Sequence, residues 1–229
     1  MSFMNTRRKF LGKVIGAATA ASLPLGKMSS AAAAEGSEHD AWLKGITGKH
    51  KCFFDFPAHK KGAPLIHILN YIATYQAAYG ADISDISVVG SMYAIGPDSS
   101  IAMAFNDDMW AKYRFGEYLS LNDPQTGKAA VRNLFYKTMD GDEIPRVGPL
   151  GPFPPASVSS LQKDMGVTFL LCNNAAVALG MDLERLGFGP AAENTADLVA
   201  NLLPGIQVVP AMVIAIEQAQ GAGMAYNKQ

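Results

Sequence analysis

Cysteine and histidine are scarce in this chain of 229 residues, which contains two cysteines and four histidines. Neither residue type shows the close pairing along the sequence that is typical of zinc ligands, so we expect no metal site. Long apolar runs are lacking as well. The weakly apolar run at residues 14–25 is too short to span a bilayer, because a membrane helix needs about 20 apolar residues. No later segment is apolar enough, so we expect no membrane insertion of the mature chain.

The first 34 residues have the order of an export signal. Two adjacent arginines, Arg7 and Arg8, precede the apolar run, and small residues ending at Ala34 form a cleavage site. We therefore predict that residues 1–34 are a twin-arginine signal peptide, which carries folded cargo to the periplasm. The alternative interpretation is a basic amphipathic tail.

Positive charge is scarce once the signal is set aside. Residues 1–34 hold five of the 19 basic residues and none of the 20 acidic ones, so the mature chain has a net charge of −6. A chain with this excess of acid has no broad attraction to nucleic acid or to anionic lipid, and we expect neither as a partner.

Short apolar runs alternate with segments of helical periodicity along the mature chain. This alternation predicts an α/β fold with a parallel sheet and helices on both faces. The expected strands are residues 51–56, 83–89, 166–171, 206–209 and 224–226. The expected helices are residues 64–79, 157–165, 175–186, 195–203 and 210–220, and residues 100–119 are expected to form one long helix or two short ones. We therefore predict a single domain over residues 50–229 with one five-stranded parallel sheet.

Two segments are expected to stay outside this core. Residues 35–49 are polar and contain glycine and histidine, which favours a flexible leader. Residues 122–156 are rich in proline and glycine, which indicates an insertion or surface loop rather than a packed element.

An aromatic and methionine stripe lies within the expected helix at residues 100–119. Phe105, Met109 and Tyr113 recur at helical spacing, and Trp110 is next to them. Such a stripe could hold a flat cofactor, but it is more typical of a hydrophobic core. We therefore expect no cofactor.

Cys172 is the candidate catalytic residue. It follows a buried strand directly and precedes a helix, and in an open parallel sheet functional sites form at that carboxyl edge. A helix amino terminus carries about half a positive charge and stabilises a thiolate, the reactive form of cysteine. Asn173 and Asn174 are candidate binding residues, since their amides would meet the sulfur. The alternative is a buried cysteine that serves only as a small apolar side chain.

Cys52 stands near the amino end of its expected strand, whereas Cys172 stands at the carboxyl end of its own. Five residues of strand separate these levels by roughly 16 Å, and a disulfide needs Cα atoms within about 7 Å. We therefore predict no bond between the two cysteines, and a structural role for Cys52.

The segment Cys172-Asn173-Asn174-Ala175-Ala176-Val177-Ala178-Leu179-Gly180-Met181 resembles the cysteine segment of the DsrE/DsrF-like sulfur-relay family. Residues 202–210 and 222–226 are similar to the carboxyl terminus of exported DsrE-like proteins. The resemblance implies a persulfide-carrying cysteine, here Cys172, and assembly into trimers, hexamers or hetero-oligomers. Carriers in this family often have basic residues just before the glycine, whereas this chain has Ala178 and Leu179.

The resemblance implies a periplasmic sulfur carrier or sulfurtransferase-like protein. It would accept sulfane sulfur at Cys172 and exchange it with a donor or acceptor protein. The alternative is a non-catalytic oligomeric module of the same fold that binds a small molecule or a partner.

Overall fold

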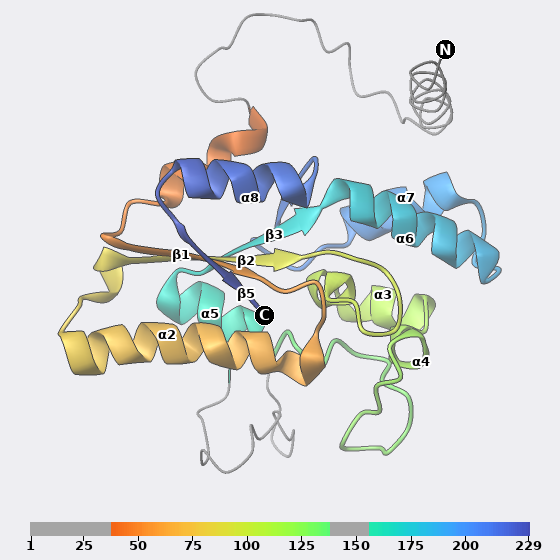
Figure 1. The fold of residues 1–229 in the computed structure, drawn as a ribbon. Helices are drawn as coiled ribbons and strands as arrows, with labels where there is room; N and C mark the ends of the chain where they lie inside the picture. The colour runs from red at the N-terminus through yellow and green to blue at the C-terminus, as the bar shows by residue number, and fades with distance from the viewer. Residues whose placement is uncertain (1–37, 138–155) are drawn as a thin grey trace, which may run out of the picture. The chain divides into compact units, whose positions relative to one another are not determined.

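The computed structural model describes residues 38–137 and 156–229, so the predicted signal at residues 1–34 lies outside the described residues. The predicted α/β fold is confirmed. One sheet of five parallel strands has the order β4-β3-β2-β1-β5 (Figure 1). The strands are β1 (His50–Asp55), β2 (Ile86–Met92), β3 (Thr168–Cys172), β4 (Gln207–Val209) and β5 (Ala225–Lys228).

Helices cover both faces of this sheet (Figure 1). One face packs against α2 (Ala63–Tyr79) and α5 (Val158–Met165), and the other packs against α8 (Met212–Gly221) and the short 3-10 helix η1 (Glu38–Gly45). The remaining helices are α3 (Asp107–Lys112), α4 (Phe115–Tyr118), α6 (Asn173–Arg185), α7 (Ala191–Ala200) and the 3-10 turns η2 (Lys60–Gly62), η3 (Ile83–Asp85) and η4 (Ile101–Ala104). Among the described residues, no helix is long and apolar enough to cross a bilayer.

Local sequence signals set several helix ends. Pro64 lies in the first turn of α2, where its missing N–H costs no hydrogen bond, and Gly80 ends α2 with a φ of 65°. Ser157 caps α5 in a capping box with Ser160. These ends agree with the expected helices at residues 64–79 and 157–165.

Side chains of each strand alternate between the two faces. In β1, Cys52 and Phe54 pack with the large core under α2, whereas Phe53 packs with the smaller core under α8. The aromatic stripe at Phe105, Trp110 and the neighbouring residues belongs to the large core, as expected for core residues. Both faces of the sheet are therefore covered by buried side chains.

The prediction of a flexible leader is wrong for residues 38–49. Trp42 and Ile46 are buried in the smaller core with Phe53, Val209 and Met212. The local composition of this segment is polar, but one tryptophan and one isoleucine supply enough apolar area to dock η1 on the sheet.

Residues 122–137 contain no helix or strand, as predicted for a loop, but the prediction that this loop is unpacked is wrong; residues 138–155 of the segment lie outside the described residues. Ala130 and Phe135 are buried, and so is Asn133. The Asn133 carboxamide donates hydrogen bonds to the carbonyl oxygens of Met103 at 3.1 Å and Phe105 at 2.7 Å. Asn133 thus satisfies buried backbone acceptors that lie far away in the sequence. The proline and glycine content of the segment could not reveal these hydrogen bonds.

Candidate functional site

Cys172 is the last residue of β3 and the residue from which α6 begins, as the sequence predicts. The helix starts two residues earlier than expected, at Asn173, so Cys172 itself is the N-cap and neither asparagine caps the helix. The Cys172 backbone is still extended, with φ −77° and ψ 115°. The sulfur therefore stands where the strand ends and the positive end of a helix dipole begins.

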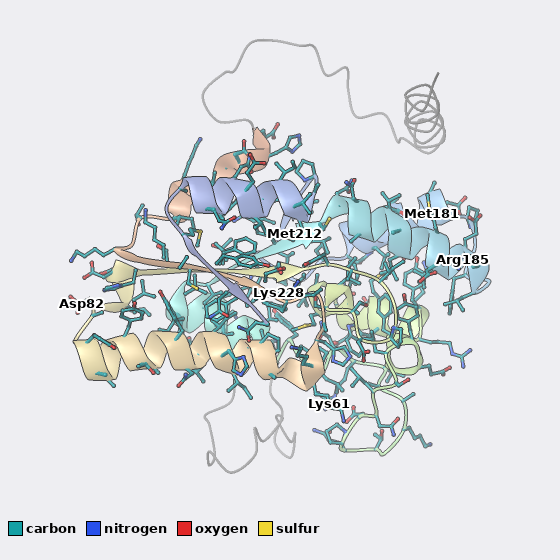
Figure 2. All side chains as sticks on the ribbon, in the orientation of Figure 1. Lys61, Asp82, Met181, Arg185, Met212 and Lys228 are labelled. Atoms are coloured by element: carbon teal, nitrogen blue, oxygen red, sulfur yellow. The ribbon has the colours of Figure 1, made fainter. Side chains whose placement is uncertain are left out.

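A second helix also begins at this sulfur. The backbone N–H of Met212, the first residue of α8, donates a hydrogen bond to Cys172 Sγ at 3.4 Å. Figure 2 labels Met212 at the start of α8, on one side of the sheet. N–H groups in the first turn of a helix have no acceptor within the helix, and for Met212 the sulfur of Cys172 is the acceptor. Two helix amino termini meet at Cys172.

The two predicted binding residues are the first two residues of α6. The backbone N–H of Asn174 donates to the carbonyl oxygen of Pro210 at 3.3 Å, so that amide is not aimed at the sulfur. Asn173 is half-buried and Asn174 is exposed. In the part of the chain that the structure describes, neither carboxamide forms a hydrogen bond, so both remain able to meet a ligand.

The sulfur of Cys172 is nearly enclosed. The residue is 6% exposed and belongs to the smaller core, with Leu170, Val209 and Met212. The partly exposed ring of Tyr93 packs on the same core at the carboxyl edge.

A buried carboxylate lies on the same face and edge of the sheet. Asp55, the last residue of β1, is 2% exposed. The Ser91 hydroxyl donates to its Oδ1 at 3.1 Å, and the Tyr226 hydroxyl donates to its Oδ2 at 2.6 Å. Ser91 Oγ also accepts the backbone N–H of Phe56 at 2.9 Å, which fixes its orientation.

Tyr93 links this carboxylate to the neighbourhood of the sulfur. Burial raises the pKa of Tyr93, and hydrogen bonding to Asp55 and the charge of that carboxylate raise it further. Tyr93 packs on the smaller core, to which Cys172 also belongs. We call Asp55, Ser91, Tyr93 and Tyr226 the hydroxyl–carboxylate cluster.

The sheet register explains how the cluster assembles. Phe54 pairs with Gly90, which places Asp55 beside Ser91, and Phe53 pairs with Tyr226 on the other side. Strands β5, β1, β2 and β3 follow one another in the sheet. Residues as far apart in sequence as Asp55 and Tyr226 therefore meet along its carboxyl edge. Sequence reasoning missed this cluster. Side chains alternate along a strand, so Asp55 lies on the same α8 face as Phe53. This alternation was the one feature of the sequence that indicated the position of Asp55.

The two cysteines lie on opposite faces of the sheet and are both free. Cys52 packs under α2, and burial raises the pKa of its thiol to about 11. The predicted absence of a Cys52–Cys172 bond agrees with this placement.

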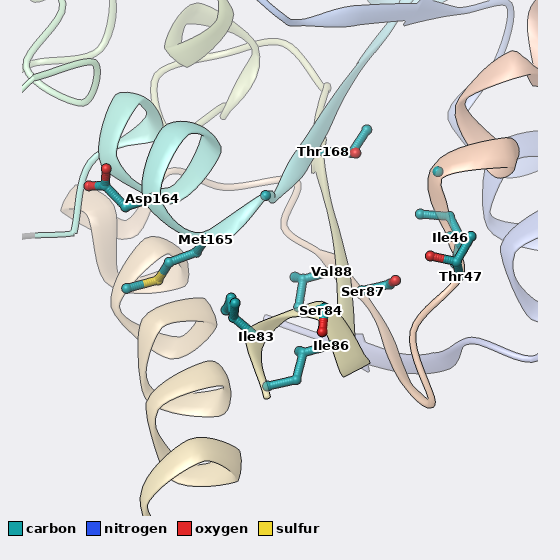
Figure 3. A pocket seen from close by; sticks show the side chains of 12 residues that line it. Ile46, Thr47, Ile83, Ser84, Ile86, Ser87, Val88, Asp164, Met165 and Thr168 are labelled. Carbon is teal, nitrogen blue, oxygen red and sulfur yellow. The ribbon is translucent and has the colours of Figure 1, made fainter. Parts of the chain in front are cut away.

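A cavity of about 290 Å³ lies at the opposite, amino edge of the sheet (Figure 3). Its wall includes Ile46, Ile86 and Thr168, the last two being the first residues of β2 and β3. Ligand sites in open parallel sheets lie at the carboxyl ends of strands, so this cavity is the weaker candidate.

Over residues 38–137 and 156–229, no group of three or more metal-ligating side chains is present. Comparison with known proteins finds no matching protein-family model. It also finds no similar curated protein and no similar solved structure. The resemblance to DsrE-like proteins therefore stays a prediction from the Cys172 segment and the carboxyl-terminal residues 202–210 and 222–226.

Proposed function

We propose that this protein is a periplasmic DsrE-like sulfur carrier, or a sulfurtransferase-like protein, that holds sulfane sulfur as a persulfide on Cys172. The observation that carries the proposal is the hydrogen bond that the Met212 N–H, at the amino terminus of α8, donates to Sγ of Cys172, the N-cap residue of α6. Oriented N–H groups and helix dipoles stabilise an anionic sulfur, whether a thiolate or a persulfide.

The transfer step follows from this placement. The Cys172 thiolate attacks the outer sulfur of a donor persulfide, a new S–S bond forms on Cys172, and the donor's S–S bond breaks. The donor sulfur leaves with that electron pair as a thiolate, and the persulfide proton stays on the transferred sulfur. The reverse sequence delivers the sulfur to an acceptor thiol, so no external oxidant or reductant is required.

Export in folded form suits such a site. The sulfur, the α8 amide and the surrounding core come from segments spread over the whole domain, so the site exists only after folding. A twin-arginine signal at residues 1–34, which lies outside the described residues, would carry the finished site to the periplasm.

We expect incubation of the folded protein with a sulfane-sulfur donor to add 32 Da at Cys172, measured by intact and peptide mass spectrometry. Cys172→Ala should lose the adduct completely, whereas the matched variant Cys52→Ala should retain it, because Cys52 lies in the core on the other face. Protein that folds normally and carries no adduct at Cys172 would rule the carrier function out.

The second candidate is a non-catalytic binding module of the same fold, and the near-complete burial of Cys172 favours it. In that case the carboxyl edge would hold a ligand without covalent chemistry at the sulfur. Ligand binding that is unchanged in Cys172→Ala, together with the absence of the 32 Da adduct, would select this function over the first.

We also propose that the protein assembles with copies of itself through the first turn of α8. Val213 is 71% exposed and Ile214 is 48% exposed, and both stand next to Met212. We expect Val213→Glu to shift the protein toward the monomer in light scattering after size exclusion, because a charge cannot be buried unpaired in an apolar interface. Gln220→Glu, the same charge on the last turn of α8, should leave the mass unchanged. A wild-type monomer would contradict this proposal.

A further inference from the structure

The hydroxyl–carboxylate cluster contains a buried negative charge that is stabilised without a cation. Asp55 accepts hydrogen bonds from Ser91 and Tyr226 and interacts with the Tyr93 hydroxyl. Within the described ranges, no lysine, arginine or histidine forms an ion pair with it. Lys228 is its register partner on β5, and Figure 2 labels this residue there, but it makes no such pair. In the described part of the chain, the carboxylate of Asp55 is therefore stabilised by hydrogen bonds and is not held in an ion pair.

The hydrogen bonds also decide what the cluster offers to a ligand. Hydrogen bonding to Asp55 raises the pKa of Tyr226 to about 12, so this hydroxyl keeps its proton at neutral pH and directs it inward. A tyrosine hydroxyl that donates to a carboxylate retains only acceptor lone pairs for its other neighbours. Tyr226 is 41% exposed and Tyr93 is partly exposed, so these lone pairs and the ring faces reach the surface.

The cluster itself offers an oxyanion no free hydrogen-bond donor, because its hydroxyls are directed at Asp55, and the donors of this edge lie on the Cys172 side. A primary ammonium group finds three favourable features: acceptor oxygens, the charge of Asp55 behind them, and aromatic faces for cation–π contact. We propose that the hydroxyl–carboxylate cluster is a binding subsite beside Cys172 for a ligand that carries a primary ammonium group, and that it rejects anionic ligands. The subsite concerns binding, and it does not require that Cys172 forms a persulfide.

A matched pair of thiol reagents tests the subsite. The 2-aminoethyl and 2-sulfonatoethyl methanethiosulfonates differ in charge at the end of the same short chain, and each forms a mixed disulfide with a thiolate and releases methanesulfinate. After correction for their rates with free cysteine, we expect the cationic reagent to modify Cys172 at least about tenfold faster, because Asp55 attracts its ammonium end in a partly buried site.

Asp55→Asn should bring the two corrected rates within about twofold of each other. Asp85→Asn, which removes the same charge at the amino edge of the sheet, should leave the preference intact. Tyr226→Phe keeps Asp55 and removes one acceptor, so it should reduce the preference in part even if Asp55→Asn does not fold. A purely structural role of Asp55 would change both rates together.

A second measurement does not depend on the reactivity of Cys172. In the Cys172→Ala variant, ligand-observed NMR should detect binding of cysteamine but not of 2-mercaptoethanesulfonate. Adding Asp55→Asn to this variant should abolish the binding of cysteamine. Equal binding of the two probes, binding of neither, or a preference that survives Asp55→Asn would overturn the subsite. A missing 32 Da adduct would overturn only the sulfur-carrier function.

Discussion

Replacing Gly116 with alanine is expected to lower the free energy of unfolding by about 3 kcal/mol, the upper end of the usual cost of overpacking. A Cβ atom at this position in α4 would lie 2.2 Å from the backbone nitrogen of Ala130 and 2.3 Å from its carbonyl oxygen. The obstacle is backbone and cannot rotate away. It is also pinned, because the Ala130 N–H donates to Leu121, whose own N–H donates to Gly116.

Urea denaturation followed by circular dichroism gives this free energy directly. Gly221→Ala is the matched control, since it lies at the end of α8 with no atom within 4 Å of the added Cβ. We expect this control to stay within about 0.5 kcal/mol of the wild type. If Gly116→Ala were equally harmless, the packing of residues 122–137 against α4 would be wrong.

The two cysteines are expected to differ in alkylation by more than about 100-fold in the folded protein at pH 7. Burial raises the pKa of Cys52 to about 11, so only about one thiol in 10,000 is ionised at this pH, and the residue is also covered by α2. Cys172 lies at the carboxyl edge and accepts a backbone N–H. Peptide mapping after timed iodoacetamide treatment measures each rate.

Unfolding in urea should remove the difference, because both thiols then meet the same solvent. Cys52→Ala and Cys172→Ala assign each signal to its residue. Faster labelling of Cys52 than of Cys172 in the folded protein would contradict both the placement of Cys52 under α2 and the reactivity proposed for Cys172.

Local signals were sufficient for the architecture. The alternation of short apolar runs with helical stripes predicts the five parallel strands, and Pro64, Gly80 and Ser157 mark helix ends that the structure confirms. The strand–cysteine–helix pattern also places Cys172 correctly at the carboxyl edge. These features depend on neighbours in sequence, which is why a single sequence reveals them.

The rest of the site depends on strand order, which composition and periodicity do not give. Asp55 meets Ser91 and Tyr226 only because β1 lies between β2 and β5. The Met212 N–H meets Cys172 only because α8 begins beside β3. Trp42 and Asn133 were misjudged for the same reason: each lies in a polar or proline-rich stretch but packs against residues far along the chain.

The hydrogen bond between Tyr226 and Asp55 joins residues 171 positions apart, and it connects β5 with β1. A nascent chain leaves the ribosome from its amino end, so β1 must wait with one side unpaired until nearly the whole domain has been synthesised. Contacts of such long range slow the final closure of a sheet. The carboxyl edge of the sheet around Cys172 is thus completed only after β5 has been synthesised and the whole domain can fold.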